Sequence, residues 1–189
     1  MTRFFRSVRR DRGAAAVETG LIIGLLLLIA MGAVEWGLGL KDWLSVTAGT
    51  REGARVGAAA GDTAGADCVI LEATAGAVRD INGAVLEVWI YESDSSGAIG
   101  PKQAYRPALP TEPALICTTG NWFAIETSWP ESTRVNTGGN RDWLGVRVAF
   151  DHDWLTGFLW FSGSVCNRGV SGNCWSADTV MRVEPDPNP

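Results

Sequence analysis

The stretch Arg12-Gly13-Ala14-Ala15-Ala16-Val17-Glu18 leads into an apolar run from Leu21 to Val34, and these residues decide the fold. The sixteen residues between Glu18 and Glu35 carry no charge. The twenty-one residues from position 14 to position 34 would form a helix about 31 Å long, which matches the thickness of one bilayer core. The sequence therefore predicts a single transmembrane helix near the N-terminus.

The charges that flank this helix favour one orientation. Residues 1–13 hold five arginines and one aspartate, a net charge of +4. Because the formal charge of the whole chain is −5, the rest of the chain carries a net charge of −9. Arginines on one side of a span favour the cytoplasm for that side, which predicts a cytoplasmic N-terminus and an extracytoplasmic C-terminal domain. The acidic remainder lacks the basic footprint that phosphate backbones require, so nucleic acid is excluded as a partner.

Glu18 lies about one turn inside the predicted span, where a carboxylate is energetically unfavourable and indicates a function. Gly13 and Ala14 are small residues that the basic leader would hold at the cytoplasmic face, as a prepilin peptidase requires of its substrate. Cleavage between them would give Ala14 a free ammonium group. In a helical assembly, a neighbour's ammonium could pair with Glu18 in a low dielectric, where the attraction is stronger than in water. A plain signal anchor with an incidental glutamate is the alternative.

The chain resembles the TadE-like proteins, minor pilin-like components of the Tad (Flp-type) pilus system. The resemblance covers about residues 9–60. It rests on the Arg12 to Glu18 motif and the leucine-rich run, then on Val34-Glu35-Trp36-Gly37 and Arg51-Glu52-Gly53-Ala54-Arg55. It is looser at three later stretches, which are Gly145 to Phe150, Leu155-Thr156-Gly157 and Met181 to Pro185.

This resemblance implies processing between Gly13 and Ala14, a single-pass inner-membrane intermediate and participation in pilus assembly, and it leaves open both a place at the pilus base and a place in the filament at the cell surface. The implied partners are the membrane, a prepilin peptidase, other pilins and Tad assembly proteins. The chain departs from the family at Thr19, where an aromatic residue usually follows the glutamate, and this departure bears on cleavage efficiency.

The remainder of the chain predicts an α+β fold. The first helix remains helix-compatible to Ala60, and Gly61 to Gly65 reads as a linker. A second helix is expected from Ala66 to Ile81 with one apolar face, before a turn at Asn82-Gly83. The apolar face consists of Val69, Ile70, Ala73, Ala77 and Ile81.

Period-two patterns predict an antiparallel sheet from four strands, at Ala84 to Tyr91, Asn121 to Ser128, Trp143 to Phe150 and Ala177 to Glu184. Pro101 to Pro113 reads as a long surface loop, and Leu155 to Phe161 as a helical turn or a buried strand. The predicted organisation is a basic leader (1–13), a transmembrane and extended helix (14–60), an extracytoplasmic α+β domain (61–184) and a frayed tail (185–189).

Small residues recur at helical spacing along the first helix. Glycine in a helix interior costs about 1 kcal/mol relative to alanine, a cost that close approach of another backbone offsets. The alternative is that the chain is simply rich in glycine, with 23 in total. The two predicted packing stripes are Gly20, Gly24 and Gly32, and Gly49, Gly53 and Gly57.

Two charged features accompany the helix. Glu35 lies at the far boundary of the apolar run, beside the interfacial aromatic Trp36, and is either an assembly contact or a charge that reaches the headgroups. Arg51 and Arg55 share a helical face, with Glu52 three residues before Arg55, which is either a docking patch or a solvated face.

Four cysteines lie in the exported part, an even number that predicts two disulfides. Of the three possible pairings, Cys166–Cys174 with Cys68–Cys117 is preferred, because a short turn-rich loop separates Cys166 from Cys174. No closely spaced ligand pair supports a zinc site. The glycine-rich segments lack the lysine and spacing of a phosphate loop. We therefore predict no metal and no cofactor.

The single histidine, His152, lies between Asp151 and Asp153 and is expected to be an exposed loop residue. A catalytic role is the alternative, but no glycine-flanked serine nucleophile accompanies it. We therefore predict no catalytic residues. Of the nine tryptophans, most are expected in the core and an exposed subset would form a contact surface.

Two other functions compete with a pilin-like one. A tethered or secreted binding protein would use the first apolar run as an ordinary signal sequence, with a cleavage site at Ala30-Met31-Gly32. An envelope enzyme would use His152.

Overall fold

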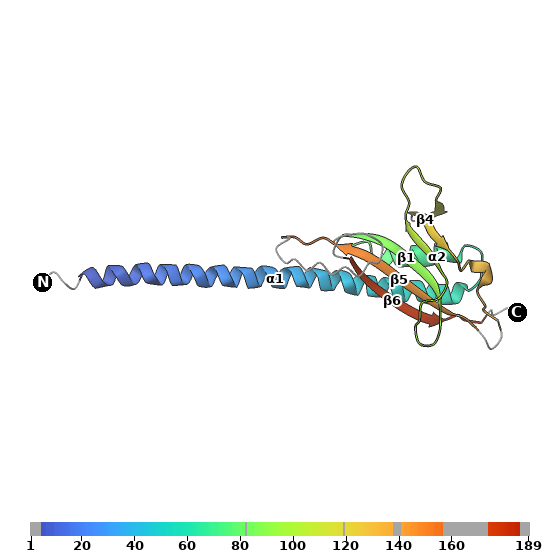
Figure 1. The fold of residues 1–189 in the computed structure, drawn as a ribbon, viewed down its shortest axis with the longest axis horizontal. Coiled ribbons are helices and arrows are strands. Elements are labelled where there is room, and N and C mark those ends of the chain that lie inside the picture. Colours follow the sequence, from blue (N-terminus) through green and yellow to red (C-terminus); the bar gives the residue numbers. More distant parts are fainter. Residues whose placement is uncertain (1–4, 82, 119, 138–140, 157–173, 186–189) are drawn as a thin grey trace.

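The computed structural model describes residues 5–81, 83–118, 120–137, 141–156 and 174–185. One helix, α1 (Phe5–Ala60, 56 residues), runs from the N-terminal end into a domain that contains every other element (Figure 1). We call residues 13–34 of α1 the stem. The head comprises the described residues from Glu35 onward, including the C-terminal part of α1.

The stem lies outside the core of the protein. Its large apolar side chains, from Val17 to Val34, are 46–73% exposed. By length and composition α1 is able to cross a membrane, and it is the one such helix in the described chain. Exposed apolar surface on this scale requires a covering phase, which is lipid or other apolar helices.

The head has two layers, a pair of helices and one sheet. Helix α2 (Ala66–Ala77) follows α1 after a turn in which Gly61 and Gly65 have positive φ. The antiparallel sheet has the order β3-β4-β2-β1-β5-β6. Its strands are β1 (Gly83–Ser93), β2 (Lys102–Pro107), β3 (Leu115–Cys117), β4 (Gly120–Thr127), β5 (Trp143–His152) and β6 (Cys174–Arg182), with a short 3-10 helix, η1 (Glu131–Thr133), before β5. This architecture confirms the predicted α+β class.

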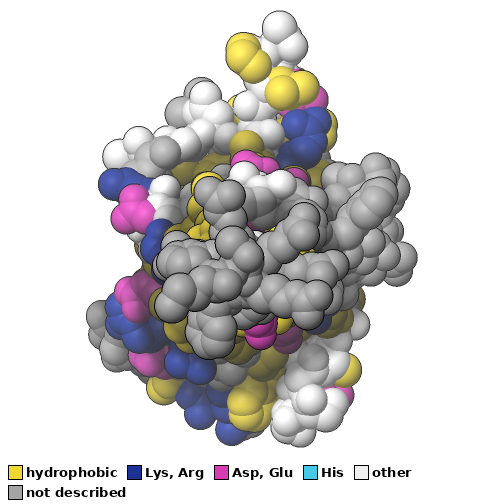
Figure 2. All heavy atoms as spheres, turned by 90° about the vertical axis from the view of Figure 1, so that its left-hand side faces the viewer, with side chains coloured by type: hydrophobic (Ala, Val, Ile, Leu, Met, Phe, Trp, Pro, Cys, Tyr) yellow, Lys and Arg dark blue, Asp and Glu magenta, His cyan; other side chains and the backbone are white. Residues whose placement is uncertain are grey.

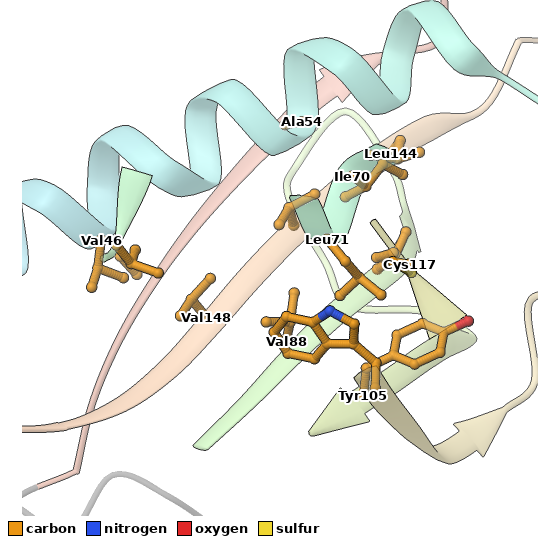
Figure 3. Packing of buried hydrophobic residues seen from close by; sticks show 14 of the residues in the cluster. Val46, Ala54, Ile70, Leu71, Val88, Tyr105, Cys117, Leu144 and Val148 are labelled. Carbon is orange, nitrogen blue, oxygen red and sulfur yellow. The ribbon is translucent and has the colours of Figure 1, made fainter. Parts of the chain in front are cut away.

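The core lies between the helices and one face of the sheet (Figure 3). Both helices and all six strands contribute to it, because alternate residues of a strand point to the same side of the sheet. Thr50 of α1 also lies 3.0 Å, hydroxyl to hydroxyl, from Thr179 of β6. The core side chains labelled in Figure 3 are Val46, Ala54, Ile70, Leu71, Val88, Tyr105, Cys117, Leu144 and Val148.

Three predicted strands are confirmed with small changes in their bounds, and the closing strand begins at Cys174 rather than Ala177. The prediction of a continuous surface loop over 101–113 was wrong, because β2 occupies Lys102–Pro107 between β1 and β4. Pro107, which has no N–H to donate, stands at the last position of that strand. Its polar and charged residues hid the strand from the sequence pattern.

The second helix is shorter than predicted, and the side of it that is buried differs from the predicted apolar face. It ends at Ala77 rather than Ile81, and Val69 is 47% exposed. Leu71, absent from the predicted apolar face, is fully buried instead. The predicted face was wrong in part because Asp67 and Thr74 occupy the buried side together with Ala66, Ile70 and Leu71.

Most of the predicted segment 155–161 lies outside the described residues, as do Asn82 and residues 186–189 of the predicted tail. Gly83 opens β1 with a φ of +146°.

Candidate functional site: the stem helix and its junction with the head

The predicted processing residues lie on the exposed stem. Gly13, Ala14 and Glu18 are all exposed within continuous helix, far from the head in Figure 1. A Cβ added at Gly13 would meet nothing within 4 Å. Thr19 donates its hydroxyl proton to the Ala15 carbonyl (2.8 Å), an intrahelical contact available in lipid. Glu18 is exposed and makes no hydrogen bond or ion pair with the residues that the structure describes.

The two glycine stripes have different surroundings. Added Cβ atoms at Gly20 and Gly24 would meet nothing within 4 Å, whereas Gly49, Gly53 and Gly57 are buried. A Cβ at Gly53 would lie 2.2 Å from the Thr74 hydroxyl oxygen. A Cβ at Gly57 would lie 2.8–3.0 Å from the side chains of Ile70 and Leu144. The second stripe therefore lets α1 approach α2 and β5 of its own chain, and the first stripe, with the partly exposed Gly32, has no such partner in the described head.

Glu35 fastens the head to the top of the stem. Its side chain is buried (1% exposed) and accepts hydrogen bonds from the Leu155 and Thr156 amides at 3.1 and 2.6 Å. The Thr156 hydroxyl donates a third, at 2.5 Å. These bonds, led by the one from that hydroxyl, lower the pKa of the Glu35 carboxyl. Glu35 thus holds the segment that follows β5 against the first residues beyond the apolar run.

A buried contact between an aspartate and a histidine lies two turns further along the same face of α1. Asp42 Oδ2 lies 2.7 Å from His152 Nδ1, and the two side chains are 1% and 0% exposed. The expectation that His152 would be an exposed loop residue was therefore wrong. His152 is the last residue of β5, and its side chain packs against α1. His152 Nε2 is buried without a hydrogen-bond partner in the described chain.

Aromatic rings surround this pair. Trp154 packs edge-on against His152, with 4.7 Å between ring centroids, and also contacts Trp36 of α1 at 6.4 Å. Trp175 of β6 lies 6.2 Å from His152. Gly39 lies beside this cluster, and a Cβ there would make ordinary contacts, 3.6 Å from the Trp175 ring and 3.7 Å from His152 Nε2. The junction between the stem and the head is thus apolar and aromatic, and it buries the acidic side chains of Glu35 and Asp42 of α1.

A buried ion pair lies at the far end of the head. Asp67 of α2 pairs with Arg134 and accepts a hydrogen bond from the Tyr105 hydroxyl at 2.5 Å. The Asp67 and Arg134 side chains are 3% and 0% exposed, and the Arg134 guanidinium lies 4.8 Å from the centre of the Trp129 ring. Burial, reinforced by Asp67, raises the pKa of Tyr105. This network fixes α2 to β2 and to the segment before β5.

One disulfide, between Cys68 of α2 and Cys117 of β3, ties the second helix to the edge of the sheet. It is one half of the preferred pairing. Cys166, and with it the predicted Cys166–Cys174 bond, lies outside the described residues.

The remaining predicted features are ordinary surface contacts. Glu52 and Arg55 form an exposed i,i+3 ion pair at 2.6 Å, and Arg51 is exposed beside them. Viewed along the stem, acidic and basic side chains both lie around the rim of the head (Figure 2). No cluster of three or more metal-ligating side chains occurs among the residues that the structure describes.

Sequence reasoning missed Asp42, although one signal was present. Glu35, Gly39, Asp42 and Val46 follow one another at helical spacing, which places them on one face of α1. Two acidic residues on the face that also carries Gly39 and Val46 indicate polar partners inside the head. Those partners, His152 and the Leu155 and Thr156 amides, lie more than a hundred residues away, so no local sequence pattern identifies them.

A continuous exposed apolar stem that enters an α+β head is consistent with a single-pass membrane protein. A family model described as TadE-like protein matches residues 13–55, which comprise the stem and most of the α1 segment inside the head. Over these residues the chain is similar to the TadE-like family, as the resemblance implied, and that family is associated with the Tad pilus. No curated protein and no solved structure matches the chain.

Exchanging Glu35 for glutamine is expected to loosen the junction. Glutamine has one acceptor oxygen where the carboxylate has two, so it cannot satisfy both backbone amides and the Thr156 hydroxyl. We expect faster hydrogen exchange of the Leu155 and Thr156 amides, measured by mass spectrometry on the detergent-solubilised chain. Glu52→Gln, which removes an exposed carboxylate from the same helix, is the control and should leave these amides protected.

The same contact predicts a pH dependence. Because the pKa of Glu35 is lowered in the folded chain, its contribution is complete above the ordinary glutamate pKa and is lost as the pH falls through the lowered value. Protection of the two amides should follow that direction in the wild type. An equally steep acid dependence in Glu35→Gln would contradict this role for the carboxylate.

Proposed function

We propose that this protein is a minor pilin-like subunit of a Tad pilus, processed between Gly13 and Ala14 and assembled through its stem. One observation carries the proposal: Glu18 lies exposed on an isolated apolar helix, within the segment that matches the TadE-like family and five residues after Gly13. A carboxylate so placed requires a positive partner when the helix enters a low-dielectric environment. The ammonium group of a processed Ala14 on a neighbouring subunit has the charge and the height to supply it.

In this proposal the protein is inserted with its N-terminus in the cytoplasm and the head outside, and a prepilin peptidase then removes the basic leader. The chain acts structurally, and its partners are the peptidase, other pilins and Tad assembly proteins. The family association supports the pilus, and the exposed stem supports assembly through helix packing in the membrane. An oxidising compartment for the head agrees with the Cys68–Cys117 disulfide.

The Glu18→Gln variant tests the assembly step. Glutamine keeps the size and removes the charge, so membrane insertion should persist while pilus formation is lost, as scored by electron microscopy of cells that carry the variant as their single copy. Glu52→Gln is the matched control and should leave piliation unchanged. Normal fibres with Glu18→Gln, at wild-type levels of protein in the membrane, would contradict an assembly role for this residue.

Mass spectrometry of the mature N-terminus tests the processing step separately. We expect Ala14 at the N-terminus, and Gly13→Leu should leave the precursor uncut, because a bulky side chain replaces the small residue at the cut. A mature N-terminus near residue 33 would instead support the alternative, a tethered or secreted envelope binding protein that has lost its stem.

A further inference from the structure

The head carries an exposed apolar patch where the stem enters it. Four of its residues belong to α1, and the fifth belongs to the segment that follows β5. Trp36, Leu40, Trp43 and Leu44 are 40–61% exposed, and Leu155 is 62% exposed. We call these five residues the base patch.

No exposed charge separates the base patch from the stem. Glu35 is the only charged residue of α1 between Thr19 and Leu40, and its carboxylate is buried against two amides of the head. Lys41 is the first exposed charged residue beyond it. The base patch therefore continues the apolar surface of the stem.

The height of the base patch matches the headgroup layer of a bilayer. That layer adds about 5–8 Å to each side of the hydrocarbon core. At about 1.5 Å per residue, the Cα atoms of Leu40 and Trp43 lie about 9 Å and 14 Å beyond Val34. Helical side chains lean back over the preceding turn, which here is the side of the membrane, so both side chains reach into this layer. Leu155 lies lower still, because its amide bonds to Glu35.

The residue types at this end of the head are those of a membrane interface. Tryptophan is enriched at the level of the headgroups, and the base patch contains Trp36 and Trp43. Lys41 and Arg79 are exposed cations nearby, and the Lys41 ammonium reaches the Asp80 carbonyl at 2.7 Å. Acidic and basic side chains both lie around this rim (Figure 2), and lipid headgroups that carry both charges offer partners to each.

From these observations we infer that the base patch binds the headgroup layer of the membrane that the stem crosses. The partner is lipid, because the base patch is continuous with the stem and a bilayer that covers Val34 also reaches Trp36 and Leu155. The head then rests on the membrane surface and does not project from it on a free length of helix. Glu35 contributes by keeping its charge out of the surface that faces lipid.

The inference rests on the proposed membrane insertion and is independent of cleavage after Gly13 and of the role of Glu18. It deepens the proposed function by naming lipid as a partner of the head as well as of the stem.

Thiol labelling of the full chain in vesicles tests this contact. The vesicles consist of phosphatidylethanolamine with phosphatidylglycerol as the minor lipid, and they hold the chain at high dilution. Leu40→Cys and Leu155→Cys place thiols on the base patch from two elements. Ala48→Cys, at an exposed position about 12 Å further along α1 than Leu40, is the control. We expect both patch thiols to react about tenfold more slowly than the control with a membrane-impermeant maleimide, because headgroups shield them from water.

A nitroxide on the lipid headgroup identifies what covers the base patch. It should quench a fluorophore attached at Leu40→Cys or Leu155→Cys more strongly than one attached at Ala48→Cys. The wild-type chain reports any labelling of the native cysteines. Slow labelling together with this quenching supports the inference. Equal labelling rates at the three positions overturn it, and so does slow labelling without quenching by the lipid nitroxide, which a second copy or another protein would give.

Extraction with alkaline carbonate separates this failure from failure of the proposed membrane insertion. A chain that stays in the membrane but shows equal labelling rates refutes the headgroup contact alone. A chain that carbonate extracts refutes both the contact and the insertion.

Discussion

The Asp67→Ala variant is expected to lose about 3–5 kcal/mol of the free energy of unfolding. The change leaves the buried Arg134 guanidinium without its carboxylate, and the Tyr105 hydroxyl loses its acceptor. Arginine cannot escape by deprotonation, because its pKa lies far above any physiological pH. An uncompensated charge at 0% exposure is therefore the dominant cost.

Denaturant unfolding of the detergent-solubilised full chain, followed by tryptophan fluorescence, measures this loss. Trp129 packs against Arg134 and reports on the site directly. Asp62→Ala is the control, because Asp62 is exposed and bonds only to Asn136 at the surface (2.7 Å) in the described chain. A loss for Asp67→Ala no larger than that for Asp62→Ala would contradict the structural role given to the buried pair.

Removing the Cys68–Cys117 disulfide is expected to cost about 4 kcal/mol, from the entropy of closing a loop of its length in the unfolded chain. The bond spans a sequence separation of 49 residues and joins α2 to the short edge strand β3. The measurement compares Cys68→Ser/Cys117→Ser with the wild type under oxidising conditions. Reduction of the wild type should then lower its stability by at least as much as the double substitution does.

The reduced double variant supplies the control for the other two cysteines. Any further loss when a reductant is added to Cys68→Ser/Cys117→Ser belongs to Cys166 and Cys174. If the oxidised double variant were as stable as the oxidised wild type, the bond would contribute nothing to the head and its loop-closure role would be wrong.

Local patterns in the sequence predicted an element correctly where the residues of that element alone are enough to specify it. The apolar run predicted the stem, because a helix in lipid satisfies its backbone hydrogen bonds internally and needs only apolar side chains. Alternation predicted β1, β4 and β5, because each has one face in the core and the other toward solvent. The same reasoning failed at β2, where Gln103 is buried and Lys102 and Arg106 flank the core residues. That strand exists because β1 and β4 pair with both of its edges.

Long-range partners decided what the charged residues do. The sequence indicates that Glu35 is a charge at the membrane boundary or an assembly contact. In the structure its carboxylate accepts hydrogen bonds from the Leu155 and Thr156 amides. His152 read as an exposed loop residue, and it is buried against Asp42. The Gly49–Gly53–Gly57 stripe was expected to meet another backbone, and it meets α2 of the same chain. In each case the sequence marked an unusual residue without identifying what it contacts.

By itself, the sequence determined the stem and the α+β class, and it marked the resemblance to the TadE-like family and the candidate processing residues, because each follows from composition or spacing within a short segment. Only the tertiary structure decided how the head is attached to the stem. The physical reason is that burial and pairing of a charge depend on residues brought together by the whole fold. Glu35 and Asp42 acquire their roles from partners more than a hundred residues distant in the chain, whereas the role of Glu18, which has no partner in the described chain, stays a prediction from its position in the apolar run.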